Sequence, residues 1–387
     1  MKRITSIDFV RGLVMIIMAL DHVRDLIILP IYPQDPTVLE TTTPILFMTR
    51  WITHLCAPTF VFLSGTSAYL SMRNQVNFSE NRHFLFKRGL WLVFLNFTVV
   101  NFGIFFDIKF SILFSQVIAA IGFGFIGLAL LLKLSARHLG ILGLIIIFGH
   151  DLFNGVSFAR GTVLDVLWSF LMGSNFYQIS PHFALLTTYA YIPWLGIMLA
   201  GYSFGELFNL PSENRKKLFL QIGLGALVLF VALRIFNIYG DVSHWSFQKN
   251  GLFSFFSFIN VSKYPPSLLY TLVTLGISFL LLSAFDSIQN KAMDVVSVYG
   301  KVPLFYYLLH WFVIHAVACS VFFIQGYHWS DFQFEGFGFG RPKDGGGLDL
   351  FGTYLAWLSI VAFLYPICKW YSDYKMTHKE KTWLRYL

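Results

Sequence analysis

Charged residues are scarce in this sequence. Only 12% of its 387 residues are Asp, Glu, Lys or Arg, about half the share found in soluble domains, whereas 56% are apolar. This balance excludes an ordinary water-soluble globular protein. It predicts an all-α fold, a polytopic helical bundle embedded in a lipid bilayer. Aromatic residues make up 19% of the chain, which suits lipid-facing surfaces and interfacial belts.

Metal and nucleotide motifs are lacking as well. The chain has three cysteines, without the spacing of a disulfide framework or a zinc site: Cys56, Cys319 and Cys368. His310 and His315 are about 140° apart around a helix, so they do not form one metal-binding face. The glycines of 336–340 lie in a loop without the strand and helix that a nucleotide motif needs. We therefore expect no metal.

Apolar segments dominate what is present, and they predict about ten transmembrane helices. These segments cover roughly residues 6–29, 45–71, 89–106, 111–132, 138–150, 183–208, 218–238, 264–285, 302–325 and 349–371. The shorter segment 161–173 holds Asp165 and predicts an additional interfacial or re-entrant helix. We expect a single domain over 1–387, ending in a short basic cytoplasmic tail at 372–387.

The net charge of +8 has a topological explanation. Most of the 28 Lys and Arg residues fall in alternate short loops, and such loops are cytoplasmic in multi-pass proteins. This pattern places both termini in the cytoplasm. It also removes the reason to expect nucleic acid as a partner.

The first apolar segment, 6–29, is unusual because it carries many ionisable side chains. These are Asp8, Arg11, Asp21, His22, Arg24 and Asp25. Inside a membrane such groups are costly unless they are paired, hydrated or functional. On a helix His22 returns to within about 40° of Asp8, roughly 21 Å further along the axis. That face should point away from lipid.

Each of these residues has a structural alternative. Asp8 and Arg11 could form an ion pair (i, i+3) that only fixes the helix. His22 could reach the headgroups as an interfacial histidine. The neighbouring carboxylates of Asp21 and Asp25 favour a tuned imidazole instead, because a carboxylate stabilises the imidazolium and can fix its tautomer.

The chain resembles known acyltransferases. Asp8-x-x-Arg11-Gly12, with His22 fourteen residues after Asp8, resembles the first helix of the transmembrane acyltransferases. The stretches 54–70, 263–276 and 299–315 resemble a bacterial family of the heparan-α-glucosaminide N-acetyltransferase type. The heparan enzyme itself has asparagine at the position of His22, so this histidine matches the broader acyltransferase pattern better.

The resemblance implies a membrane-bound, acyl-CoA-dependent acetyltransferase in the bacterial cytoplasmic (inner) membrane. Its donor would be acetyl-CoA and its acceptor a sugar or glycan, such as an amino sugar. The expected catalytic residues are His22, Asp25 and Asp21. The expected acetyl-CoA-binding residues are Arg11, Arg73 and Arg88. The expected substrate-binding residues are Arg50, His54, His150, Asp151 and His310.

Alternatives remain for these roles and for the function. The arginines of 73–88 could be topology charges only, Arg50 and His54 a structural polar cluster, and His310 a satisfied core histidine. The chain could instead be a proton-coupled transporter with a relay along the first segment, through Asp8, Arg11, Asp21 and His22. A non-catalytic membrane scaffold is a third reading. A homo-oligomer is possible under each.

Overall fold

The computed structural model describes residues 4–33, 35–73 and 78–387. By their contacts these residues divide into two compact units. Unit 1 comprises the described parts of Met1–Cys56, Thr98–Ser111 and Ser287–Leu387, and unit 2 comprises those of Ala57–Phe97 and Ile112–Asp286.

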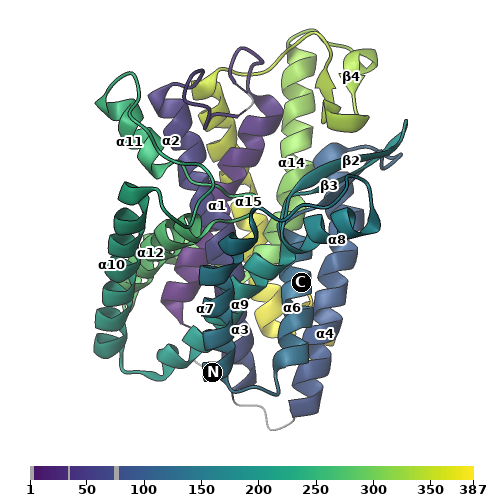
Figure 1. Ribbon diagram of the computed structural model, residues 1–387. Helices are drawn as coiled ribbons and strands as arrows, with labels where there is room; N and C mark the ends of the chain where they lie inside the picture. The colour runs from purple at the N-terminus through teal and green to yellow at the C-terminus, as the bar shows by residue number, and fades with distance from the viewer. Residues whose placement is uncertain (1–3, 34, 74–77) are drawn as a thin grey trace. The chain divides into compact units, whose positions relative to one another are not determined.

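Unit 1 is built around the first helix. Its α-helices are α1 (Thr5–Ile27), α2 (Pro44–Ile52), α5 (Asn101–Phe105), α13 (Lys291–Lys301), α14 (Pro303–Ile324) and α15 (Leu350–Thr377). Its short elements are η1 (Thr53–Leu55), η5 (Trp329–Asp331), β4 (Phe332–Gln333), η6 (Gly336–Gly338), β5 (Arg341–Pro342) and η7 (Thr382–Arg385). α1 packs against α13, α14 and α15, so it forms the centre of this unit (Figure 1).

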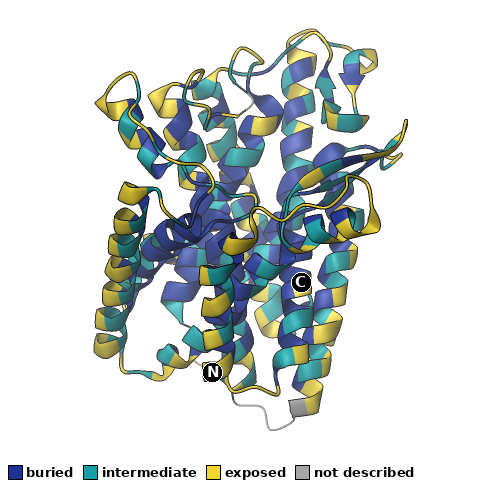
Figure 2. Ribbon diagram, viewed as in Figure 1, coloured by how far each residue is buried: buried dark blue, intermediate teal, exposed yellow. Residues whose placement is uncertain are grey.

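Unit 2 consists of packed helix pairs and a small sheet. Its α-helices are α3 (Cys56–Met72), α4 (Phe78–Leu95), α6 (Val117–Leu131), α7 (Ala136–Gly149), α8 (Val163–Leu171), α9 (Tyr191–Phe204), α10 (Ser212–Phe236), α11 (Gly251–Ile259) and α12 (Leu268–Phe285). The π-helical turn η2 (Asn96–Val100) follows α4, η3 (His150–Phe153) follows α7, and η4 (Gly205–Asn209) follows α9. α4 packs on α6, α7 on α9, and α10 on α12. Figure 2 shows α12 mostly buried, whereas α10 exposes one side along its length.

Seven helical stretches in the described ranges are long and apolar enough to cross a membrane. They are Pro44–Met72, Ser79–Phe105, Ala136–Phe153, Ser212–Phe236, Leu268–Phe285, Pro303–Ile324 and Leu350–Thr377. The three other expected spans contain α1, α6 and α9. α1 has 23 residues but carries the charged side chains noted above, and α6 and α9 are shorter, with 15 and 14 residues. The all-α polytopic bundle is confirmed, with a short helix, α8, where one was expected.

Two expected helical segments begin as strands. β1 (Ile112–Ser115) pairs in parallel with β3 (Phe183–Thr187), which pairs antiparallel with β2 (Asn175–Ser180). Figure 1 shows α8 beside the β2–β3 hairpin. Hydropathy did not distinguish these strands from helices, because a short apolar strand and the start of an apolar helix have the same composition.

The glycine-rich segment 326–348 is tied to the end of α1. The backbone N–H of Leu348 donates to the carbonyl of Ile27 at 2.8 Å, and that of Leu29 donates to the carbonyl of Leu348 at 2.9 Å. Gln325 exchanges side-chain hydrogen bonds with Gly347 at 2.6 and 3.0 Å. The segment also forms the β4–β5 pair.

Glycines meet where the helices approach most closely. At each of these crossings, a Cβ built on at least one of the two glycines would lie within 3 Å of a backbone oxygen on the opposite helix. The facing pairs are Gly12 and Gly300, Gly89 and Gly122, Gly143 and Gly196, and Gly223 and Gly276. The contact is tightest between α1 and α13, where a Cβ on Gly300 would come 1.8 Å from the carbonyl oxygen of Asp8. Small residues allow helix backbones to touch in this way.

We therefore expect Gly300→Ala to be severely destabilising. Its methyl group meets backbone, which cannot rotate aside, and such overpacking costs about 1–3 kcal/mol or more. The control is Gly225→Ala in α10, where a Cβ meets nothing within 4 Å. That variant should be as stable as the wild type or slightly more stable, because alanine favours a helix over glycine. Thermal unfolding in detergent measures both, and equal melting temperatures would contradict this account of the crossing.

Candidate functional site

The histidine of the first helix is paired with a second histidine. His22 Nδ1 on α1 lies 2.7 Å from His310 Nε2 on α14. The His22 ring also stacks on the indole of Trp311, with 4.0 Å between ring centroids and 21° between planes. His22 is half-buried and His310 is fully buried. An imidazole held on two sides in this way has a fixed orientation.

His310 is itself held by its own helix. Its Nδ1 lies 2.5 Å from the carbonyl oxygen of Tyr307, one turn earlier. The ring of Tyr306 stacks against it with 6° between planes. The two histidines thus form a short chain of hydrogen bonds that ends at a backbone carbonyl. The sequence indicated both residues as candidates for the site. It did not predict their contact, because no spacing rule links residues 288 positions apart.

Beyond His22, α1 ends in an ion-pair cluster. The carboxylate of Asp21 accepts from Arg50 at 2.5 Å and lies 2.9 Å from Arg24. Arg24 also lies 2.5 Å from Asp25, whose side chain is half exposed. His310 is thus an orienting partner of His22. The role of Asp25 as an orienting carboxylate stays a prediction.

Arg341 connects this cluster to the glycine-rich segment. Its guanidinium donates to the carbonyls of Asp25 at 3.3 Å, Ile28 at 2.5 Å and Gly346 at 3.3 Å. Burial lowers the pKa of Arg341, and the nearby charge of Asp25 acts against that shift. The sequence showed Arg341 only as one basic residue in a loop. Its hydrogen bonds instead cap the carbonyl end of α1.

At the other end of the helix, Arg11 lies 3.9 Å from Asp8 and donates to the carbonyl of Gly300 at 3.3 Å. The expected ion pair (i, i+3) is thus present. Both side chains are only slightly exposed, at 14% and 11%. This contact fits the structural alternative, and a role for Arg11 in acetyl-CoA binding stays a prediction.

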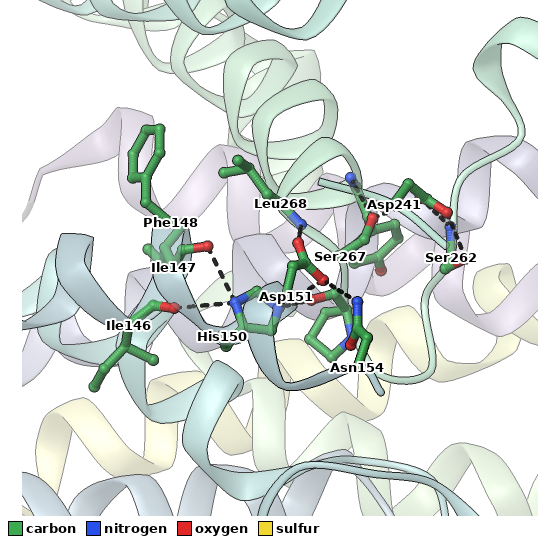
Figure 3. A network of polar contacts seen from close by, with 12 residues as sticks. Ile146, Ile147, Phe148, His150, Asp151, Asn154, Asp241, Ser262, Ser267 and Leu268 are labelled. Atoms are coloured by element: carbon green, nitrogen blue, oxygen red, sulfur yellow. Dashed lines mark hydrogen bonds and ion pairs between the residues drawn. The ribbon is translucent and has the colours of Figure 1, made fainter. Parts of the chain in front are cut away.

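His150 lies in unit 2, where carbonyl groups surround its ring. Its Nδ1 lies 3.0 Å from the carbonyl of Ile146 and 3.1 Å from that of Ile147, and its Nε2 lies 2.7 Å from that of Pro266 (Figure 3). The side chain is buried. These contacts tie the end of α7 to the segment that enters α12.

Asp151 completes this connection. Its carboxylate accepts from the backbone N–H of Leu268 at 2.8 Å and from Asn154 at 2.9 Å. Asp241 accepts from the hydroxyl of Ser267, the N-cap of α12, at 2.7 Å (Figure 3). Carboxylates at this place satisfy the first N–H groups of a helix and suit its dipole. A substrate-binding role for His150 and Asp151 stays a prediction.

The remaining candidates are dispersed. Arg73 is exposed and donates to Asn209 at 2.6 Å. The Arg88 guanidinium lies 5.5 Å from the ring centroid of Phe125. His54 is buried in η1. In the described part of the chain, no group of three or more His, Cys, Asp or Glu could hold a metal ion.

A comparison with protein families decides the relationship. The model of the heparan-alpha-glucosaminide N-acetyltransferase catalytic domain matches residues 3–240. The chain belongs to this family. The matched residues include α1 with His22, whereas His310 in α14 lies outside them. No curated protein matches the chain. The family is one of acetyltransferases, and the apolar helices make this member a membrane protein.

The ion-pair cluster should be essential for stability. Asp21→Asn removes a negative charge that faces Arg50 and Arg24. Breaking a buried ion pair by removing one partner costs about 3 kcal/mol. Glu213→Gln is the matched control, because its pair with Lys216 is at 3.4 Å and Glu213 is 85% exposed. We expect a lower melting temperature for the first variant and no measurable change for the second. Similar melting temperatures for both would show that the cluster contributes little.

Proposed function

We propose that the protein is an integral-membrane acetyltransferase that moves an acetyl group from cytoplasmic acetyl-CoA to an extracytoplasmic or lipid-linked sugar. His22 is the general base. One observation carries this proposal: within the family-matched residues, α1 presents a histidine whose ring is held by His310 and Trp311. A base that is fixed in this way can take a proton from a bound acceptor.

The reaction needs one general base. His22 takes the proton from the amine or hydroxyl of the sugar while the nitrogen or oxygen of that group bonds to the acetyl carbon. The carbon–sulfur bond of the thioester then breaks, and the CoA thiolate receives a proton from the His22 imidazolium. The base is neutral again at the end, and the products are the acetylated sugar and free CoA.

The donor is proposed to approach from the cytoplasmic end of α1. Arg11 lies on the same helix as His22, about 16 Å nearer that end. Arg11, Arg73 and Arg88 are the proposed contacts for CoA, because phosphates favour guanidinium partners. Arg50, His54, His150 and Asp151 are the proposed contacts for the acceptor sugar. His310, also a candidate for the site, is 0% exposed and acts through its hydrogen bond to His22. Asp21 and Asp25 balance the charge beside His22 as members of the ion-pair cluster.

In the proposed topology the protein lies in the bacterial cytoplasmic membrane, with both termini in the cytoplasm. This supplies acetyl-CoA from the side where it is made. A proton-coupled transporter is the competing function. Proton-dependent uptake of a solute into proteoliposomes, without acceptor-dependent release of CoA, would favour it.

His22→Gln and His22→Asn test the base. Neither amide can take up the proton, and a general base contributes about 10²–10⁴-fold in rate. We expect CoA binding and folding close to wild type and a loss of rate of this size. The wild-type rate should also fall at acidic pH, because a protonated imidazole cannot act as base. The measurement is release of CoA from acetyl-CoA by purified protein, with a panel of amino sugars and glycans.

The control is His138→Gln, at an exposed histidine near the start of α7. It should leave the rate unchanged. An acceptor-dependent rate that survives in the His22 variants would remove His22 from the mechanism.

Arg11→Ala separates acetyl-CoA binding from a structural role. If Arg11 contacts CoA, the variant should fold and bind CoA more weakly, while Asp8→Asn should leave CoA affinity unchanged. CoA-dependent thermal stabilisation measures this affinity. Equal losses of stability in both variants, with unchanged CoA affinity, would make the pair purely structural.

A further inference from the structure

We infer that His310 is a positioning residue that holds His22 in the tautomer with its lone pair on Nε2. The inference rests on the proposed function for its catalytic meaning. The tautomer itself follows from hydrogen-bond chemistry. His310 lies outside the family-matched residues 3–240.

The Tyr307 carbonyl determines where the hydrogen of His310 lies. A carbonyl oxygen can only accept a hydrogen bond, and it lies 2.5 Å from His310 Nδ1. The hydrogen of this contact must therefore be on His310 Nδ1. A neutral imidazole carries one N–H, so His310 Nε2 has a lone pair and is an acceptor.

His310 should be neutral because of its surroundings. The side chain has 0% exposure and is packed against the rings of Tyr306 and Trp311. An imidazolium at this place would lose its hydration, which costs free energy. The carbonyl contact at Nδ1 then decides which nitrogen of the neutral ring carries the hydrogen.

The hydrogen between the two rings then has one possible origin. His310 Nε2 accepts at 2.7 Å, so the donor is His22 Nδ1–H. In neutral His22 the lone pair is consequently on Nε2, the atom that takes the proton. When it does, the hydrogen bond to His310 becomes charge-assisted and stronger. His310 thus supports the charged form of the base without taking the proton.

Two substitutions divide the contacts of His310. In His310→Gln the amide oxygen can reach the place of Nε2 and accept from His22, while the contact to Tyr307 is lost. In His310→Asn the shorter amide reaches the place of Nδ1, keeps the contact to Tyr307 and loses the one to His22. Both replacements are neutral amides, so a structural effect of losing the ring is shared.

We expect His310→Gln to retain kcat to within about tenfold. His310→Asn should lose roughly 10²-fold or more in kcat, because a base in the wrong tautomer is costly. KM for acetyl-CoA should stay close to wild type in both. His138→Asn is the control and should be unchanged. Equal kcat values for the Gln and Asn variants would overturn the inference.

A second measurement needs no substitution at His310. The ¹⁵N spectrum of histidine-labelled protein in proteoliposomes reports which ring nitrogen carries hydrogen, and the His22 signals are those lost in His22→Gln. We expect hydrogen on His22 Nδ1 at neutral pH. Hydrogen on Nε2 with a bare Nδ1 would overturn the inference, even if the His310 variants fail to fold. If instead acceptor-dependent CoA release persists in His22→Gln, His22 is not the base of the proposed function, and the spectrum still decides the tautomer. If no acceptor gives CoA release in the wild type, the proposed function fails, again without affecting the spectrum.

Discussion

An ionisable side chain in apolar surroundings needs a polar partner, and this constraint governs the first helix. Charged side chains buried on α1 are paired within their own helix or with another element of unit 1, as Arg24 is with Asp21 and Asp25. Arg11 contacts the carbonyl of Gly300 on α13, Asp21 binds Arg50 on α2, and His22 pairs with His310 on α14. These contacts fix the rotation of α1 about its axis, because turning the helix would leave every one of them unpaired.

Close backbone packing makes these contacts possible. In lipid, the burial of apolar side chains contributes little to helix association, because the lipid tails are apolar too. Close packing and interhelical hydrogen bonds must therefore hold the helices together. At the α1–α13 crossing, Gly12 and Gly300 bring the backbones close enough for Arg11 to reach a carbonyl on the opposite helix. Arg11 and Gly12, which are adjacent in the sequence, thus act at the same crossing. Gly12 allows the backbones to approach, and the Arg11 side chain donates a hydrogen bond across the gap.

The sequence predicted much of the fold and part of the site. Composition and hydropathy predicted the helices. The ionisable residues of 6–29 indicated that this helix needs polar partners, because burying an ionisable side chain in a membrane costs free energy in any fold. The His22–His310 contact could not be predicted, because helical spacing relates residues only along one element. The β1–β3 pair was missed since short apolar strands resemble helices in composition. The attachment of segment 326–348 to the end of α1 was not predicted, because backbone hydrogen bonds rather than a side-chain pattern hold it there.

The hydrogen-bond chain of the two histidines also bears on the choice between catalysis and transport. A proton relay needs each member to accept a proton on one side and release one on the other. His310 could receive a proton from His22, but its own N–H points at the carbonyl of Tyr307. A carbonyl accepts a hydrogen bond and does not carry the proton onward. Of the described contacts, the His22–His310 pair therefore suits a fixed base better than a proton path that continues through His310.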